Sequence, residues 1–155
     1  MLNSTDPAKE LQWFIYELQS AEFNEEKVHV IGHIPPGHAD CLKVWSRNYY
    51  AIVTRCVEVV SLSKVILPLH DRQFHLSFIY RYELTITAQF FGHTHFDEFE
   101  LFYDPKDLSR AVSVSYICPS VTSFINLNPG YRIYYVDGDR DHSTRVRSLK
   151  LLFFG

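Results

Sequence analysis

The sequence predicts a mixed α/β fold in which two β-strands each end in a loop that carries histidines. Two short apolar runs, at residues 27–31 and 85–91, have the character of buried strands, and each stops at a glycine. A helical pattern precedes each run, and the chain from residue 98 onward is rich in strand patterns. Because α/β folds usually bind ligands at the C-terminal ends of their strands, we expect a site there.

Two helices are predicted in the N-terminal third of the chain. Thr5 or Asp6 can cap the first helix, Pro7 suits its first turn, and the helical pattern continues to about residues 20–24. The second helix is expected at residues 46–55. The segment between the first strand and this helix contains two prolines and a glycine, so we predict a loop there.

Three more strands are predicted after the second histidine loop. Their patterns cover residues 98–103, 111–117 and 131–136, and turns are expected at 104–105 and 128–130. The sequence contains no internal repeat. The order of elements therefore indicates one mixed sheet.

Composition narrows the class of protein. The 155 residues suffice for one domain with a core, and 46% hydrophobic and 15% aromatic residues indicate a globular chain. The formal charge of -3 and the absence of a basic stripe argue against nucleic-acid binding. No apolar run approaches the roughly 20 residues of a transmembrane helix. The N-terminus has no basic start and no apolar core, so no signal peptide is expected in this chain.

The cysteines exclude one kind of metal site. Cys41, Cys56 and Cys118 are odd in number and have no CxxC spacing, which rules out a cysteine zinc knuckle. At least one thiol therefore lacks a disulfide partner within the chain.

The candidate metal ligands are His33, His93 and His95. His93 and His95 are separated by one residue, so in an extended segment both imidazoles would face one side. His33 follows a glycine after the first strand in the same way. Three imidazoles from two strand ends suit Zn²⁺ or another borderline transition metal. A single histidine after a strand is usually structural or solvated. For His38 two interpretations stay open: a contact with the site and a structural role.

No carboxylate stands out in the sequence as an oxygen ligand for a metal. A two-metal hydrolase also needs a carboxylate that bridges the ions. Asp97 and Glu98 follow His95 closely, but carboxylates at such positions are more typical of caps or solvated groups. The three aspartates at residues 137–141 do not form a calcium loop, because His142 stands where glycine is needed and Ser148 where glutamate is needed.

Around these loops the sequence resembles the acid sphingomyelinase family of the calcineurin-like metallophosphoesterases. The resemblance covers roughly residues 1–55 and 82–139. Its most specific segments are residues 3–8, 11–13, 27–38, 45–50, 88–99 and 127–132.

The resemblance implies a zinc-dependent hydrolase. Members of the family hydrolyse sphingomyelin to ceramide and phosphocholine with two zinc ions in a four-layer α/β/β/α fold. By this resemblance His33 and His93 would bind one zinc and His95 the other, and a metal-activated water would attack phosphorus. The bridging aspartate and the acid are expected upstream of this chain, so no catalytic residue is assigned. The implied partner is sphingomyelin or a related phosphodiester, and a membrane surface is reached only through that lipid.

The resemblance also implies an organisation for the chain. Residues 1–142 would be the C-terminal half of a phosphoesterase domain, with an insertion foreign to the family at about 56–81, and residues 143–155 a divergent tail. We interpret the chain as a partial or mispredicted gene product, in which a normally untranslated stretch is read through at Cys56. The alternative is that the insertion is a surface hairpin between the helix and the strand.

The family's cellular location gives two further expectations. Its members are secreted or lysosomal glycoproteins, which implies glycosylation at the Asn3 sequon. Cys41 resembles a disulfide cysteine whose usual partner lies upstream.

Two alternative functions stay open at this point. One is a related phosphodiesterase that acts on nucleotides, and the other is a non-catalytic fragment. With three imidazoles and no bridging carboxylate, we expect this chain alone to be weakly active or inactive. Because imidazoles bind metal only when deprotonated, zinc affinity should fall with pH.

Overall fold

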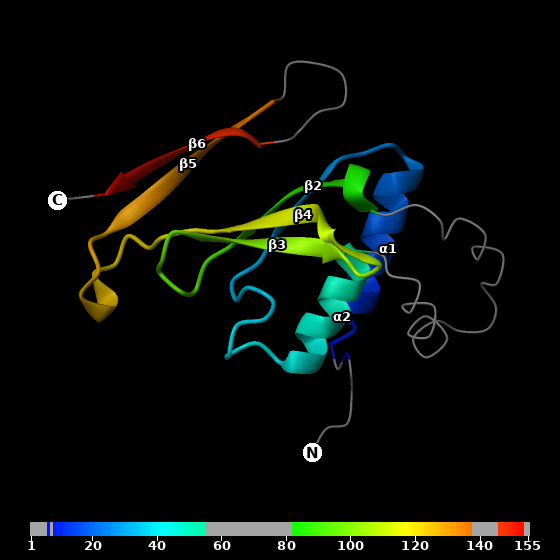
Figure 1. Ribbon diagram of the computed structural model, residues 1–155, viewed down its shortest axis with the longest axis horizontal. Helices are drawn as coiled ribbons and strands as arrows, with labels where there is room; N and C mark the ends of the chain where they lie inside the picture. Colours follow the sequence, from blue (N-terminus) through cyan, green and yellow to red (C-terminus); the bar gives the residue numbers. More distant parts are fainter. Residues whose placement is uncertain (1–5, 7, 55–81, 138–145, 154–155) are drawn as a thin grey trace.

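The computed structural model describes residue 6 and residues 8–54, 82–137 and 146–153. Every predicted helix and strand is present (Figure 1). In chain order the elements are α1 (Glu10–Phe23), β1 (Val28–Ile31), α2 (Lys43–Val53), the 3-10 turn η2 (Tyr82–Leu84), β2 (Ile86–Phe91), β3 (Glu98–Asp104), β4 (Asp107–Ile117), the 3-10 turn η3 (Phe124–Asn126), β5 (Gly130–Val136) and β6 (Val146–Phe153).

Some predicted features lie outside the described residues. They are the Asn3 sequon, Thr5, Pro7, Cys56, the insertion at 56–81, His142 and the first residues of the predicted tail.

The predicted mixed α/β class is confirmed by the main sheet. Its four strands lie in the order β1-β2-β4-β3. β1 pairs parallel to β2, β2 pairs parallel to β4, and β3 and β4 form an antiparallel hairpin. A second, two-stranded antiparallel sheet joins β5 and β6. No described helix is both long and apolar enough to cross a membrane.

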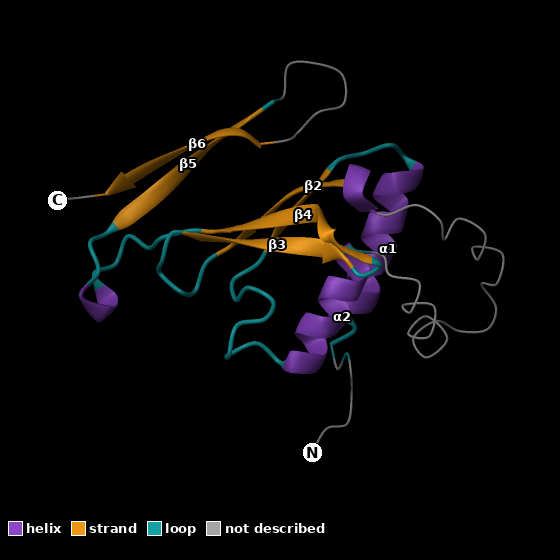
Figure 2. Ribbon diagram, in the orientation of Figure 1, coloured by secondary structure: helices purple, strands orange, loops and turns teal. Residues whose placement is uncertain are grey.

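Neighbouring residues of β2 face two different layers, because side chains alternate along a strand. Phe91 faces the helices, where its ring lies 6.1 Å from that of Tyr49 on α2. Phe90 faces the opposite side, where its ring lies 4.7 Å from that of Tyr134 on β5. The helices, the main sheet and the β5–β6 hairpin thus form an α/β/β arrangement, consistent with part of the expected sandwich (Figure 2).

The start of α1 differs from the prediction in its detail. Lys9, with φ 57°, directly precedes the helix, and no side chain caps from that position. The Asp6 carboxylate nevertheless accepts hydrogen bonds from the backbone N–H groups of Leu11 (3.3 Å) and Gln12 (3.0 Å). The capping role predicted for Asp6 is therefore confirmed, although Asp6 lies outside the helix and Lys9 directly precedes it.

Other boundaries are corrected by the structure. α2 begins at Lys43, three residues before the predicted start. β4 begins at Asp107 rather than 111, because it pairs with β3 up to the Asp104–Asp107 turn. No strand was predicted in residues 143–155, yet β6 lies there. β6 shows no clear alternation of apolar and polar residues, and it is a strand because it pairs along the whole of β5.

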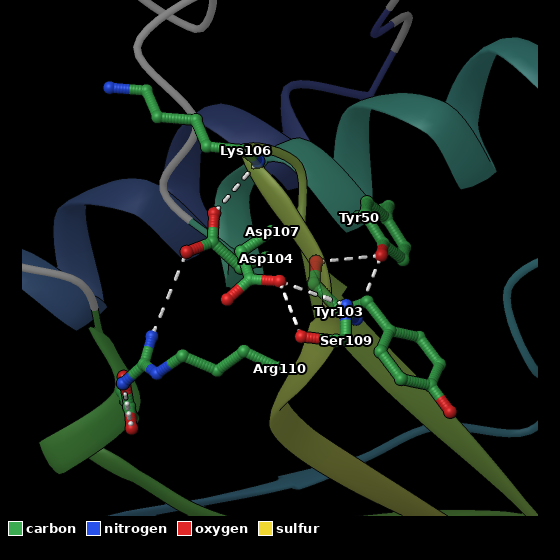
Figure 3. A network of polar contacts seen from close by, with 8 residues as sticks. Tyr50, Tyr103, Asp104, Lys106, Asp107, Ser109 and Arg110 are labelled. Atoms are coloured by element: carbon green, nitrogen blue, oxygen red, sulfur yellow. Dashed lines mark hydrogen bonds and ion pairs between the residues drawn. The ribbon is translucent and has the colours of Figure 1, made fainter.

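An irregularity in β3 is closed by a side chain from α2. The register between β3 and β4 shifts on both sides of Tyr103. The Tyr50 hydroxyl donates to the Tyr103 carbonyl and accepts from the Tyr103 N–H, both at 2.8 Å (Figure 3). One phenol therefore satisfies both backbone groups of Tyr103 and ties α2 to β3.

We predict that Tyr50→Phe destabilises the fold by about 1–3 kcal/mol, because it leaves a partly buried N–H and C=O without this partner. Urea denaturation followed by circular dichroism measures the change. Tyr16→Phe is the matched control, since Tyr16 is 68% exposed on α1; its effect should stay within about 0.5 kcal/mol. Equal effects of the two substitutions would contradict the role of Tyr50.

Candidate metal centre

Parallel pairing of β1 and β2 sets the two histidine loops next to each other. The ladder continues beyond the strand ends: the Gly32 N–H donates to the Phe90 carbonyl, and the Gly92 N–H donates to the His33 carbonyl, both at 2.9 Å. The backbone of one loop is therefore hydrogen-bonded to the backbone of the other. This contact fixes His33 beside the segment that carries His93.

The second loop is a tight turn rather than an extended segment. His93 and His95 both have left-handed backbone angles, φ 75° and 66°. The Thr94 N–H donates to the Gly92 carbonyl at 2.9 Å, which closes the turn. The assumption that an extended chain aims both imidazoles to one side is therefore wrong. Non-glycine residues in this region cost about 1–3 kcal/mol each, and such strain concentrates at functional sites.

His33 and His93 meet through their ring nitrogens. Nε2 of His33 lies 3.3 Å from Nδ1 of His93, and the two rings are nearly perpendicular. Two nitrogens that each lie about 2.05 Å from one tetrahedral zinc ion are about 3.3–3.4 Å apart. The spacing of these two donors therefore fits a shared metal ion.

His95 is held separately from this pair. Its Nδ1 is buried and has no hydrogen-bond partner among the described residues, and its ring lies 5.8 Å from that of Phe124. A buried, unpaired ring nitrogen is costly unless a ligand satisfies it. The donor chemistry of His95 thus also fits a metal, although the structure shows no contact from it to His33 or His93 within the part of the chain it describes.

Asp40 is the residue that sequence reasoning missed. Its Oδ2 lies 2.8 Å from Nε2 of His93. The Asp40 N–H donates to Nδ1 of His38 at 3.2 Å, and the His38 ring packs edge-on against His93. His38, Asp40 and His93 each offer one ligand atom, all within 4.8 Å of one another. His38 therefore does contact the candidate site.

Electrostatics at Asp40 follow from these neighbours. The hydrogen bond from His93 is the main cause that lowers the pKa of Asp40, and the charges of His38 and His93 add to it. Desolvation acts in the opposite direction and is outweighed. The carboxylate therefore stays ionised further into the acid range than an isolated aspartate.

Local hydrogen bonds explain how Asp40 reaches His93. Gly37, at φ 92°, reverses the loop, and its N–H donates to the Ser46 hydroxyl of α2 at 2.9 Å. The His38 N–H then donates to the Pro35 carbonyl at 3.3 Å. Asp40 lies seven residues after His33, a separation that carries no metal-ligand signature, and only this folded loop brings it to the site.

A cleft of about 610 Å³ opens beside the histidine loops. His38, Asp40 and His93 line part of it, and Glu98 and Glu100 of β3 line another part. Burial raises the pKa of Glu100, although the Ser115 hydroxyl donates to its carboxylate at 3.3 Å. The apolar lining comes from Pro35, Phe96, Phe99, Ile117 and Phe124.

Asp97 has a structural partner. It forms an ion pair with Arg132 of β5, whose side chain is only 6% exposed. Arg132 in turn donates to the Tyr134 hydroxyl at 3.2 Å. A carboxylate committed to a buried guanidinium is poorly suited to bridge two metal ions.

We predict that Glu100→Gln stabilises the chain more at about pH 7 than at about pH 4. Because the folded pKa of Glu100 is raised, ionisation opposes folding, and stability is lost as pH rises above the ordinary glutamate value. Glutamine removes this loss. Thermal midpoints at the two pH values measure the effect, with the exposed Glu26→Gln as control. A gain independent of pH would contradict the assignment.

The chain matches known proteins over most of its length. No family model matches the chain. It is 50% identical over 146 residues to the sphingomyelin phosphodiesterase of Homo sapiens, covering 94% of this chain and 19% of that protein. It is 39% identical over 154 residues to sphingomyelin phosphodiesterase 2 of Caenorhabditis elegans, covering 98% of this chain and 21% of that protein.

A third relative is sphingomyelin phosphodiesterase B of Dictyostelium discoideum, 41% identical over 143 residues, with 88% of this chain and 18% of that protein covered. These similarities confirm the resemblance that the histidine loops predicted. The chain is similar to these sphingomyelin phosphodiesterases over most of its own length, and it spans about one fifth of theirs.

Proposed function

We propose that this chain contributes part of a zinc-dependent site that hydrolyses the phosphodiester bond of sphingomyelin to give ceramide and phosphocholine. The observation that carries the proposal is the 3.3 Å approach of His33 Nε2 to His93 Nδ1, from loops that end two neighbouring parallel strands. The relatives named as sphingomyelin phosphodiesterases supply the substrate class. The proposed partner is therefore a phosphodiester lipid, with the membrane contacted through that lipid alone.

In this proposal His33 and His93 hold one zinc ion, and His95 holds a second. The pairing of the first two rests on their nitrogen spacing, and the role of His95 rests on its buried, unpaired Nδ1. When bound, zinc lowers the pKa of a coordinated water and stabilises charge on phosphate oxygens. The imidazoles must be neutral to act as donors, so protonation competes with metal binding.

The cleft favours a lipid over a nucleotide as substrate. Glu98 and Glu100 place negative charge on its wall, which disfavours a polyanionic ligand. Phe96, Phe99 and Phe124 offer apolar surface at the same opening. A zwitterionic lipid headgroup with hydrocarbon behind it suits this combination better than a nucleotide does.

The described residues do not complete a two-metal site. Such sites need a bridging carboxylate, and Asp97, next to the second histidine loop, is paired with Arg132. We therefore propose that the chain alone binds zinc weakly and hydrolyses its substrate slowly, with the acid and the bridging carboxylate supplied from outside these 155 residues.

Glycosylation at Asn3 and an extracellular or lysosomal location are also proposed. Both are supported by the sequon and by the family resemblance.

Removal of one imidazole should weaken metal binding. We predict that His33→Ala and His93→Ala each lower the affinity for Zn²⁺ by more than about 10-fold, since even a lost outer-sphere partner costs that much. Isothermal titration calorimetry measures the change, and acidification should weaken binding of the unsubstituted chain. His29→Ala is the control, because His29 lies on β1 before the loop. Unchanged affinity in both site variants would refute the proposed centre.

Activity should be detectable but low. With added Zn²⁺, we expect the chain to release phosphocholine from sphingomyelin with a turnover below about 1 s⁻¹, the lower end of ordinary enzymes. His93→Ala should abolish the release. Turnover at ordinary enzyme rates would contradict the proposal that the site is incomplete. Cleavage of a nucleotide diester that is faster than cleavage of sphingomyelin would contradict the proposed substrate. Zinc binding without any release would identify a non-catalytic fragment.

A further inference from the structure

Asp40 and His93 form a directed contact on the side of the imidazole that faces away from His33. Oδ2 of Asp40 lies 2.8 Å from Nε2 of His93, while Nδ1 of the same ring faces His33 at 3.3 Å. The two ring nitrogens of His93 therefore have different partners. One is a carboxylate, which can only accept a proton when ionised, and the other is an imidazole.

This difference selects one tautomer of His93. A neutral imidazole carries a single N–H, and the ionised carboxylate of Asp40 requires that proton on Nε2. Nδ1 is then left with its lone pair directed at the space shared with Nε2 of His33. The opposite tautomer would place a lone pair against the carboxylate and a proton where a metal should bind.

We propose that Asp40 is a positioning residue for the metal centre, which holds the proton of His93 on Nε2 and thereby presents Nδ1 to the metal. The inference rests on the proposed zinc site and extends it to a residue outside the ligand set. Carboxylates that orient metal-bound histidines in this way raise the basicity of the ligand and fix its ring.

The loop is built to hold Asp40 in this position. Its N–H donates to Nδ1 of His38, and the Cys41 N–H donates to the His38 carbonyl at 3.0 Å. These bonds fix the backbone on both sides of the Asp40 side chain. Because that side chain is 64% exposed, water competes for the contact, and the effect on affinity should lie at the lower end of the range for such partners.

A direct role of Asp40 as ligand is the competing arrangement. His38, Asp40 and His93 could hold an ion among themselves, since their ligand atoms lie within 4.8 Å. In the structure, however, Nε2 of His93 contacts the Asp40 carboxylate and Nδ1 of His38 accepts from the Asp40 N–H. His33→Ala separates the arrangements, because it removes a ligand from the proposed pair of His33 and His93 and none from the group of His38, Asp40 and His93.

The tautomer is measured on the metal-free full chain. Long-range proton–nitrogen NMR spectra at about pH 8.5, where histidines are neutral, distinguish the protonated nitrogen of each ring. We expect His93 to carry its proton on Nε2 in the unsubstituted chain and to become a mixture of tautomers in Asp40→Ala. Asp40→Asn should also give a mixture, because its amide can either accept from Nε2–H or donate to an unprotonated Nε2. Glu26→Gln is the control for loss of a negative charge, because Glu26 precedes the N-terminal end of β1 and the histidine loop follows the C-terminal end. It should leave the tautomer of His93 unchanged.

The consequence for metal binding is measured by titration with Co²⁺ as a spectroscopic probe. We expect Asp40→Ala to weaken binding by about 10-fold, and Asp40→Asn to weaken it less. His33→Ala should weaken binding by more than about 10-fold, and Glu26→Gln should leave the affinity within about twofold of the unsubstituted chain.

The outcomes separate this inference from the function on which it rests. If the unsubstituted chain binds no Co²⁺, the proposed metal centre fails, whatever the tautomer of His93. If Co²⁺ binds but Asp40→Ala alters neither the tautomer nor the affinity, only the role of Asp40 is overturned. Unchanged affinity in His33→Ala together with a loss in Asp40→Ala would also overturn it, in favour of direct ligation.

Discussion

The parallel pairing of β1 and β2 is the constraint on which the candidate site depends. Parallel strands place both C-terminal ends at one edge of the sheet, and here the hydrogen bonds continue past those ends into the loops. The close approach also requires a residue without a side chain: a Cβ on Gly32 would lie 2.6 Å from the Phe91 ring. Gly32 thus leaves room for the Phe91 ring, and the approach of His33 to His93 follows from the backbone hydrogen bonds between the two loops.

The sheet that holds this register is anchored to the helices by a buried polar contact. Gln89 of β2 is fully buried, its carbonyl accepts from the Tyr49 hydroxyl of α2 at 2.6 Å, and its amide donates to Ser113 of β4 at 2.8 Å. A buried amide is tolerated only when its groups are paired. This pairing links α2 to the two strands behind the histidine loops, so the packing of the helices and the position of the site are connected.

The sequence predicted those parts of the fold that depend on local pattern. Apolar runs, turn residues and helical spacing identified α1, α2 and β1 to β5, and the glycine–histidine motifs identified His33 and His93. The sequence patterns did not predict contacts between residues far apart in the chain. β6 is a strand because β5 pairs with it, and Asp40 reaches His93 because Gly37 turns the loop back. The turn at His93 and His95 was missed because positive φ angles are uncommon in residues other than glycine.

The central claim is that His33 and His93 share one metal ion. A crystal structure of the chain grown with Zn²⁺, with anomalous scattering measured at the zinc edge, tests it most directly. We expect an anomalous peak about 2.0–2.1 Å from both His33 Nε2 and His93 Nδ1, with the Asp40 carboxylate still on His93 Nε2. A peak between His38, Asp40 and His93 that leaves His33 without metal would contradict it.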